Sequence, residues 1–154
     1  MCALFSYYKG EYEQFIKDAL GSNNDLIKIL ISEVRDKLIN DLEQLGIKIN
    51  GEYRHTIDNN AIKHSIKKHS KMKESLRGQV PITLDDLSHI PEIIDTYDSL
   101  STSKNRRNQD VIIYEKKFIG CTSIYVEEVR RGRLELAACT IYKRKNDGSP
   151  TLID

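Results

Sequence analysis

The sequence predicts an α+β protein whose N-terminal helices pack on a C-terminal antiparallel sheet of about four strands. Two observations support this fold class. In the first half of the chain, apolar residues recur three and four positions apart, which is typical of amphipathic helices. After residue 110 the apolar period becomes two, as in half-buried strands. Helices grouped first and strands grouped last indicate an α+β fold and argue against an alternating α/β fold.

Two helices are expected before residue 46. The first covers residues 11–20. The second runs from Asn24 to Leu45, because its apolar side chains recur at helical spacing, and it stops at Gly46. Residues 1–45 are therefore expected to form a helical N-terminal part.

A hairpin and a third helix are expected next. Residues 47–57 alternate apolar and polar side chains about Asn50 and Gly51, a pair that suits a tight turn. Asp58 then caps a helix that covers residues 59–76.

The second half begins with a short helical turn and ends in strands. Thr83 and Asp86 have the spacing of a capping box, and Pro91 interrupts the helical turn that they open. Residues 96–109, rich in serine, asparagine and charge, are expected to form a loop. Three strands follow, the last two joined by a turn at Arg131 and Gly132, and they cover residues 111–119, 122–129 and 134–142.

Length and composition predict a single soluble domain. The chain has 154 residues, of which 39% are hydrophobic and 31% are charged. No apolar run approaches the roughly 20 residues that span a bilayer, and the first residues lack the pattern of a secretory signal. We therefore expect no membrane association and a place in the cytoplasm of a host or target cell. Residues 46–145 are expected to form the core and residues 146–154 a flexible tail.

The three cysteines are expected to be reduced structural thiols. Cys2, Cys121 and Cys139 are odd in number, lie far apart and form no CxxC pair, so neither a disulfide framework nor a cysteine zinc site is indicated. A thiol nucleophile is the alternative, although Cys121 and Cys139 lie in strand-like sequence.

The net charge of +1 conceals a strong segregation of charge along the chain. Residues 61–78 contain six basic side chains and one acidic one, whereas residues 79–101 contain five acidic side chains and no lysine or arginine. Such segregation can give the molecule one positive face, which suits a polyanion such as RNA; solvated loops and helix ends are the alternative. The candidate nucleic-acid contacts are Lys63, Lys67, Lys71, Arg106, Arg107, Arg131, Lys143 and Arg144.

Three histidines beside the lysine cluster are the main candidates for catalysis: His55, His64 and His69. Two imidazoles can cleave RNA without a metal, because one takes the proton of the ribose 2′-hydroxyl and the other protonates the leaving 5′-oxygen. A cation such as Lys68 would stabilise the charge on the phosphorane-like transition state. The expected first product is a 2′,3′-cyclic phosphate.

Helix geometry restricts how these histidines can combine. His64 and His69 are five residues apart, about 140° around a helix, so they cannot both enter one small pocket. A pairing of His55 with one of the other two is geometrically easier. Each also has a structural interpretation, since His69 shares an apolar stripe with Ile62 and His64 lies on the lysine side of the same helix.

A metal or cofactor site is not indicated by the sequence. No HxxxH or HExxH pattern completes a zinc site around the histidines, and no glycine-rich phosphate loop is present. His89, in an acidic turn, is expected to be structural. In the last strand Thr140 and Tyr142 share a face, where they either present two hydroxyls side by side or serve as ordinary strand formers.

Four segments resemble, in their order and residues, phage-encoded nucleases of the barnase, EndoU, colicin and RelE-like group, domains that often sit behind phage MuF-type head proteins or in polyvalent proteins. The resemblance runs from Gly46 to Lys143, through residues 46–55, 62–69, 78–94 and 134–143. It implies helices packed on a four-stranded antiparallel sheet and metal-independent endoribonuclease activity.

The resemblance also implies site residues. By position, His55, His64, Lys68 and His69 match the histidine-rich helix region of these nucleases, and Thr140 with Tyr142 match the terminal strand that commonly adds a hydroxyl to the site. The strand departs from the pattern at Ala138 and Cys139, where bulkier residues are expected, so its register is open.

The leading functional hypothesis is an endoribonuclease of phage or mobile-element origin that acts as a toxin or effector on host RNA, tRNA included. A cognate immunity or antitoxin protein is the partner that such a toxin would need. A second hypothesis is a non-catalytic phage accessory or inhibitor protein that binds nucleic acid or a host protein through the basic face. A third is a zinc-dependent hydrolase.

Overall fold

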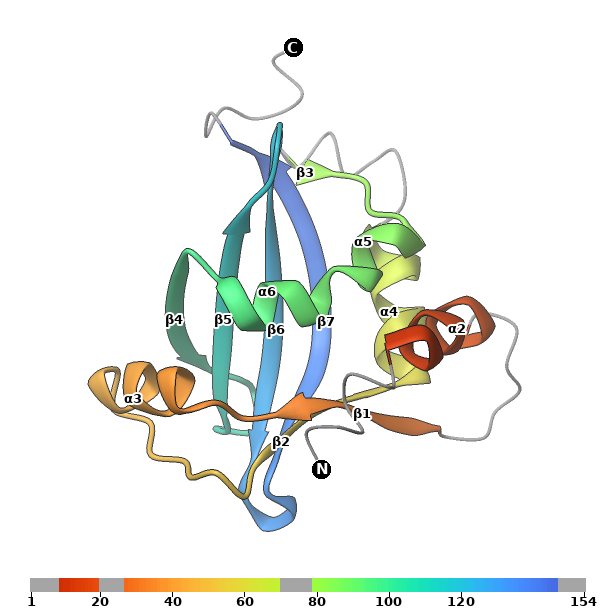
Figure 1. The fold of residues 1–154 in the computed structure, drawn as a ribbon. Helices are drawn as coiled ribbons and strands as arrows, with labels where there is room; N and C mark the ends of the chain where they lie inside the picture. Colours follow the sequence, from red (N-terminus) through yellow and green to blue (C-terminus); the bar gives the residue numbers. More distant parts are fainter. Residues whose placement is uncertain (1–8, 20–26, 70–78, 147–154) are drawn as a thin grey trace.

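A mixed β-sheet runs through the centre of the molecule, as the computed structural model shows for residues 9–19, 27–69 and 79–146 (Figure 1). Six strands lie side by side in the order β1-β2-β7-β6-β5-β4, and the short β3 pairs with β7. Among the described strands, only β2 and β7 run parallel; the other neighbours are antiparallel. The strands are β1 (Lys28–Glu33), β2 (Arg54–Asp58), β3 (Gln79–Val80), β4 (Ser99–Lys104), β5 (Asp110–Lys117), β6 (Cys121–Arg130) and β7 (Glu135–Lys145).

The α+β class is confirmed, but the sheet is larger than expected. Strands β4 to β7 form an antiparallel block of the size predicted, and β1, β2 and β3 extend it. The three C-terminal strands lie where the two-residue period placed them. The turn between the last two is a 3₁₀ turn, Arg131–Arg133, closed by Leu134 in the left-handed region at φ 54°.

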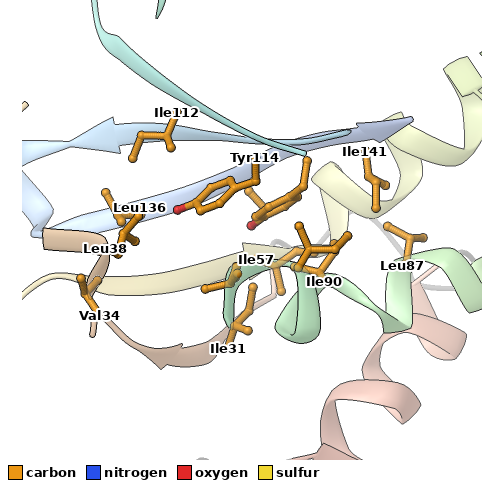
Figure 2. Packing of buried hydrophobic residues seen from close by; sticks show 14 of the residues in the cluster. Ile31, Val34, Leu38, Ile57, Leu87, Ile90, Ile112, Tyr114, Leu136 and Ile141 are labelled. Atoms are coloured by element: carbon orange, nitrogen blue, oxygen red, sulfur yellow. The ribbon is translucent and has the colours of Figure 1, made fainter. Parts of the chain in front are cut away.

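Helices pack on one face of the sheet, here called the helix face, which presents Ile57, Ile112, Tyr114, Leu136 and Ile141. Figure 2 shows Tyr114 and Ile141 of the sheet pointing toward Leu87 and Ile90, which belong to α5 and α6. The helices are α2 (Lys9–Ala19), α3 (Asp36–Gln44), α4 (Asn59–His69), α5 (Leu84–Ser88) and α6 (Ile90–Thr96).

The opposite face of the sheet, here called the open face, carries no helix among the described residues. Alternation along the paired strands places on it Ile113, Val126, Thr140, Tyr142 and Arg144, all of them half-buried.

The long helix expected from Asn24 to Leu45 is wrong in its first half. Residues Lys28–Glu33 form strand β1, and only Asp36–Gln44 are helical. Ile29 and Ile31 satisfy the strand period as well as the helical one, and pairing with β2 decides between them because tertiary contacts override helix propensity. The N-terminal part is therefore not wholly helical.

The expected loop over residues 96–109 contains an edge strand, β4, paired only with β5. An edge strand with one neighbour tolerates a polar sequence, and Ser99–Lys104 alternates half-buried with exposed residues. Its serine-rich composition is therefore compatible with a strand.

The expected hairpin over residues 47–57 is a turn without a first strand. The Asn50 side chain accepts from the N–H of Glu52 at 2.8 Å, which fixes the turn, but only Arg54–Asp58 are extended in a sheet. Strand β2 pairs instead with β1 and β7.

Two predicted helix caps are confirmed. Asp58 Oδ1 accepts from the N–H of Ala61 at 2.8 Å at the start of α4. Thr83 and Asp86 form a reciprocal capping box at the start of α5. Helix α4 is described as far as His69; the rest of the predicted helix, with residues 70–76, and the tail from residue 147 lie outside the described residues.

Helix α4 closes a gap beside β7. On one side of β7, β2 pairs with its first residues and β3 with Lys143 and Arg144, so the stretch between them has no neighbouring strand. There Ser65 of α4, itself buried, accepts a hydrogen bond from the N–H of Ile141 at 3.2 Å. The helix thereby satisfies a backbone group that the sheet leaves open.

Within the described parts of the chain, no helix combines the length and the apolar character needed to cross a bilayer.

A matched pair of isoleucines tests the packing on the helix face. Ile112 is fully buried and Ile119 is fully exposed. We expect Ile112→Ala to lower the free energy of unfolding by about 2–5 kcal/mol, because it leaves a cavity, and Ile119→Ala to change it by less than about 0.5 kcal/mol. Urea denaturation followed by circular dichroism measures both. Equal losses for the two variants would contradict the assigned faces.

Candidate active site

Four side chains from α4 and β7 meet at the edge of the open face, and we call them the α4–β7 cluster: Ser65, His69, Thr140 and Tyr142. The ring of His69 lies 5.4 Å from that of Tyr142, centre to centre, at a tilt of 31°. Ser65 Oγ donates to Thr140 Oγ1 at 3.3 Å. The cluster joins the predicted site residues of the helix to those of the terminal strand.

Local geometry explains this meeting. Ser65 and His69 are four residues apart on α4 and so lie on one side of the helix. Thr140 and Tyr142 are two apart on β7 and share its open face. The register of β7, which the sequence left open at Cys139, changes there by a β-bulge. Ala138 pairs with Glu127 and Thr140 with Val126, which leaves Cys139 unpaired.

The Tyr142 hydroxyl keeps its proton at neutral pH. Burial raises the pKa of Tyr142, and the Glu115 carboxylate raises it further, against the opposing effect of the Arg144 guanidinium. Arg144 in turn lies 2.5 Å from Glu115. A half-buried phenol of this kind can donate a hydrogen bond or a proton to a bound oxyanion.

His64 and Lys68 lie on the exposed side of α4. Partial burial lowers the pKa of His64, and the charges of Lys68, His69 and Lys67 lower it further. His64 is therefore neutral at pH 7 but does not enter the α4–β7 cluster, as its 140° offset from His69 on the helix requires.

His55 is separate from the other histidines. It lies on the helix face, 1% exposed, where its Nδ1 is 2.7 Å from Oε2 of Glu127. Its strand neighbour on β7 is Leu136, six residues or about 20 Å along the strand from Tyr142. The expectation that His55 pairs with His64 or His69 is therefore not met, because β2 turns His55 into the core.

The surroundings of His55 do not suit a phosphodiester. It lines a cavity of about 770 Å³ on the helix face. Negative charge predominates in the lining, which includes one arginine and one lysine against the carboxylates of Glu13, Glu33, Asp85, Glu92 and Asp95. Such a cavity repels a polyanion.

The basic candidates for nucleic-acid contact are dispersed. Lys67 is exposed beside Lys68 on α4, and Arg144 shares the open face with Tyr142. Lys143 instead points to the helix face, where it pairs with Asp86 at 2.9 Å. Three arginines lie at the other end of the sheet, Arg106 and Arg107 at the β4–β5 turn and Arg131 bound to Asp110. Lys63 is half-buried on α4, and Lys71 lies outside the described residues.

The described thiols are free, and neither belongs to the cluster. Burial raises the pKa of Cys139 to about 11, so its thiolate, the nucleophilic form, is scarce at neutral pH. Cys2 lies outside the described residues. Among the described residues, no three side chains of the metal-binding types gather into one group.

Sequence reasoning missed two residues, Ser65 and Glu127. Ser65 follows Ile62 by three residues and precedes His69 by four, so helical spacing could have placed it on the buried stripe of the helix. Glu127, 0% exposed, accepts from the hydroxyls of Tyr114 at 2.5 Å and Tyr125 at 2.9 Å. The sequence signal for Glu127 was an acidic residue within a strand that is otherwise largely apolar.

Comparison with known proteins gives one match. The model of the family described as phage-Barnase-EndoU-ColicinE5/D-RelE like nuclease3 matches residues 30–149, which include every described element except α2 and the first residues of β1. No curated protein and no solved structure matches the chain.

The environment of His64 makes a testable prediction. We expect its imidazole to titrate below the ordinary histidine pKa, because burial and nearby cations disfavour the charged form. Lys68→Gln removes one of those cations and should raise the pKa of His64. NMR titration of the imidazole signals measures the pKa of His64 in the parent chain and in the variant. Lys48→Gln, in the segment between α3 and β2, is the control. A His64 pKa at the ordinary value that does not change in the Lys68→Gln variant would contradict this electrostatic explanation.

Proposed function

Because the chain belongs to the nuclease family described as phage-Barnase-EndoU-ColicinE5/D-RelE like nuclease3, we propose that it is a metal-independent endoribonuclease acting at the α4–β7 cluster. The observation that carries the proposal is the contact of His69 with Tyr142 beside Thr140, between segments about 70 residues apart in sequence. His69, itself buried, thus lies together with the half-buried hydroxyl side chains of Thr140 and Tyr142 where α4 meets the edge of the open face.

The proposed reaction is a transesterification. His69 takes the proton of the ribose 2′-hydroxyl, whose oxygen attacks the adjacent phosphorus. The bond from phosphorus to the 5′-oxygen breaks, and the Tyr142 hydroxyl protonates that oxygen. The products are a 2′,3′-cyclic phosphate and a free 5′-hydroxyl, and the proton on His69 returns to Tyr142 through solvent.

Neighbouring groups would hold the phosphate. The Thr140 hydroxyl, already oriented by Ser65, is placed to donate to a phosphate oxygen. Arg144 on the open face and Lys68 at the end of α4 supply positive charge where the transition state gains negative charge. His64, neutral and exposed, lies at the rim and is proposed to contact RNA outside the reacting bond.

The proposed biological role follows from the chemistry. An enzyme of this family that cuts host RNA, tRNA included, would act as a toxin or effector of phage or mobile-element origin. A cognate immunity or antitoxin protein would then need an acidic surface to cover the lysines of α4.

Site variants test the proposal. We expect the purified chain to cleave RNA in EDTA and to leave fragments with 2′,3′-cyclic phosphate ends. His69→Gln and Tyr142→Phe should each lower the rate by about 10²-fold or more, because each removes a proton-transfer group. His89→Gln, which changes a half-buried histidine at the α5–α6 junction, is the matched control and should leave the rate unchanged. Gel analysis and end-specific labelling of the fragments measure these outcomes.

Three results would contradict the proposal. Loss of cleavage in EDTA would indicate a metal-dependent hydrolase. Full activity of the His69→Gln variant would remove that residue from the mechanism. RNA binding without cleavage, weakened by Lys68→Gln but not by His69→Gln, would indicate the non-catalytic binding protein, whose affinity falls with salt as phosphate contacts are lost.

A further inference from the structure

The cavity on the helix face has no role in the proposed cleavage of RNA. It is walled by α2, β1, α3, α5 and α6, and its volume of about 770 Å³ lies within the range of small-molecule sites. His55 of β2 lines it as well.

Two deeply buried polar side chains of the lining keep an unused hydrogen-bonding atom. Nδ1 of His55 lies 2.7 Å from Oε2 of Glu127, which also accepts from the hydroxyls of Tyr114 and Tyr125, so Nε2 is the ring nitrogen left for a ligand. Among the described residues nothing bonds Nε2. Ser32, opposite His55 on β1 and only 9% exposed, has an Oγ that likewise has no partner in the described part of the chain.

The charge of the cavity lining determines whether a cation or an anion is attracted. Of its lysine and arginine residues, Arg35 is already paired with Asp95 at 2.5 Å, and Lys37 with Asp41 at 2.9 Å. His89, which also lines the cavity, lies 3.5 Å from carboxylate oxygens of both Asp85 and Glu92. The remaining carboxylates leave the cavity with an excess of negative charge. A cation is attracted there and an anion is repelled.

The rest of the wall is apolar. Leu30, Ile31, Leu38 and Ile94 line the cavity together with the ring of Tyr12. These side chains would bury the hydrocarbon body of a ligand, while Ser32 Oγ and the carboxylates would hold its charged end.

We propose that this cavity binds a small organic cation, an amine or amidine carried on an apolar body. An N–H of the cation donates to Ser32 Oγ, and another donates to Nε2 of His55 in the neutral tautomer that keeps its proton on Nδ1. The carboxylates of Glu13, Asp85 and Glu92 balance its charge. The site is independent of the α4–β7 cluster, so its test does not depend on RNA cleavage.

Three probes of one shape and different charge test the proposal: benzamidinium, benzamide and benzoate. We expect benzamidinium to shift the amide and imidazole NMR signals of Ser32 and His55 in the full chain saturably. Benzamide and benzoate should bind at least about tenfold more weakly, because neither carries the positive charge that the carboxylates of the lining attract.

Variants locate the site. Ser32→Ala should weaken benzamidinium binding while leaving the His55–Glu127 network intact. Glu13→Gln combined with Glu92→Gln should weaken it by about threefold or more, since it removes two carboxylates. Glu43→Gln combined with Glu52→Gln, two exposed carboxylates outside the lining, is the matched control and should bind like the parent chain.

The proposal is overturned if benzamidinium produces no saturable shift at Ser32 and His55, or if benzamide binds equally well, which would mean that the cavity selects only for apolar shape. It is also overturned if the control pair weakens binding as much as the pair in the lining, because the attraction would then come from overall charge.

Discussion

The hydrogen bond from the Ile141 N–H to Ser65 Oγ is the contact on which the candidate site depends. Strand β7 is longer than β2, and β3 covers only its far end, so part of its edge would be bare without α4. A buried amide without a partner costs about 1–3 kcal/mol. A serine on α4 satisfies that amide, and the same hydroxyl donates to Thr140. Helix and strand are thus held at the spacing that brings His69 to Tyr142.

The sheet divides the molecule into two chemically different halves. On the open face, Tyr142 and Thr140 lie beside Arg144 and the basic end of α4. On the helix face, His55 is bound to Glu127 and opens into a cavity with an acidic lining. The acidic segment of the chain therefore lies on the helix face, because α5 and α6 cover that face only, whereas the basic residues are dispersed over α4, the sheet and its far end. One histidine lies on each side, His69 at the edge of the open face and His55 on the helix face.

The parts of the fold fixed by local signals could be predicted from the sequence. The capping residues Asp58 and Thr83 hydrogen-bond as their spacing required, and the strongly periodic C-terminal strands lie where they were expected. Strand β1 could not be recognised, because Ile29 and Ile31 fit both periods and only pairing with β2 selects the strand. Strand β4 was hidden by polar residues that an edge strand tolerates.

The arrangement of the α4–β7 cluster could be predicted only in part, for the same reason. Periodicity on one helix and one strand placed His69 near the buried stripe and Thr140 with Tyr142 on one face. That these two elements touch depends on the bulge at Cys139 and on Ser65, neither of which a periodic pattern contains. The separation of His55 from the cluster could not be read from the sequence, because the direction in which His55 points is set by the pairing of β2 with β7, a contact between residues about 80 apart in the sequence.

The most direct measurement of the central claim is an NMR titration of the full chain with a short 2′-O-methyl RNA, which has no attacking hydroxyl and remains uncut. We expect the signals of Ser65, His69, Thr140 and Tyr142 to shift together, while those of Ser32 and His55 stay in place. Shifts centred on Ser32 and His55, with the α4–β7 cluster unchanged, would contradict it.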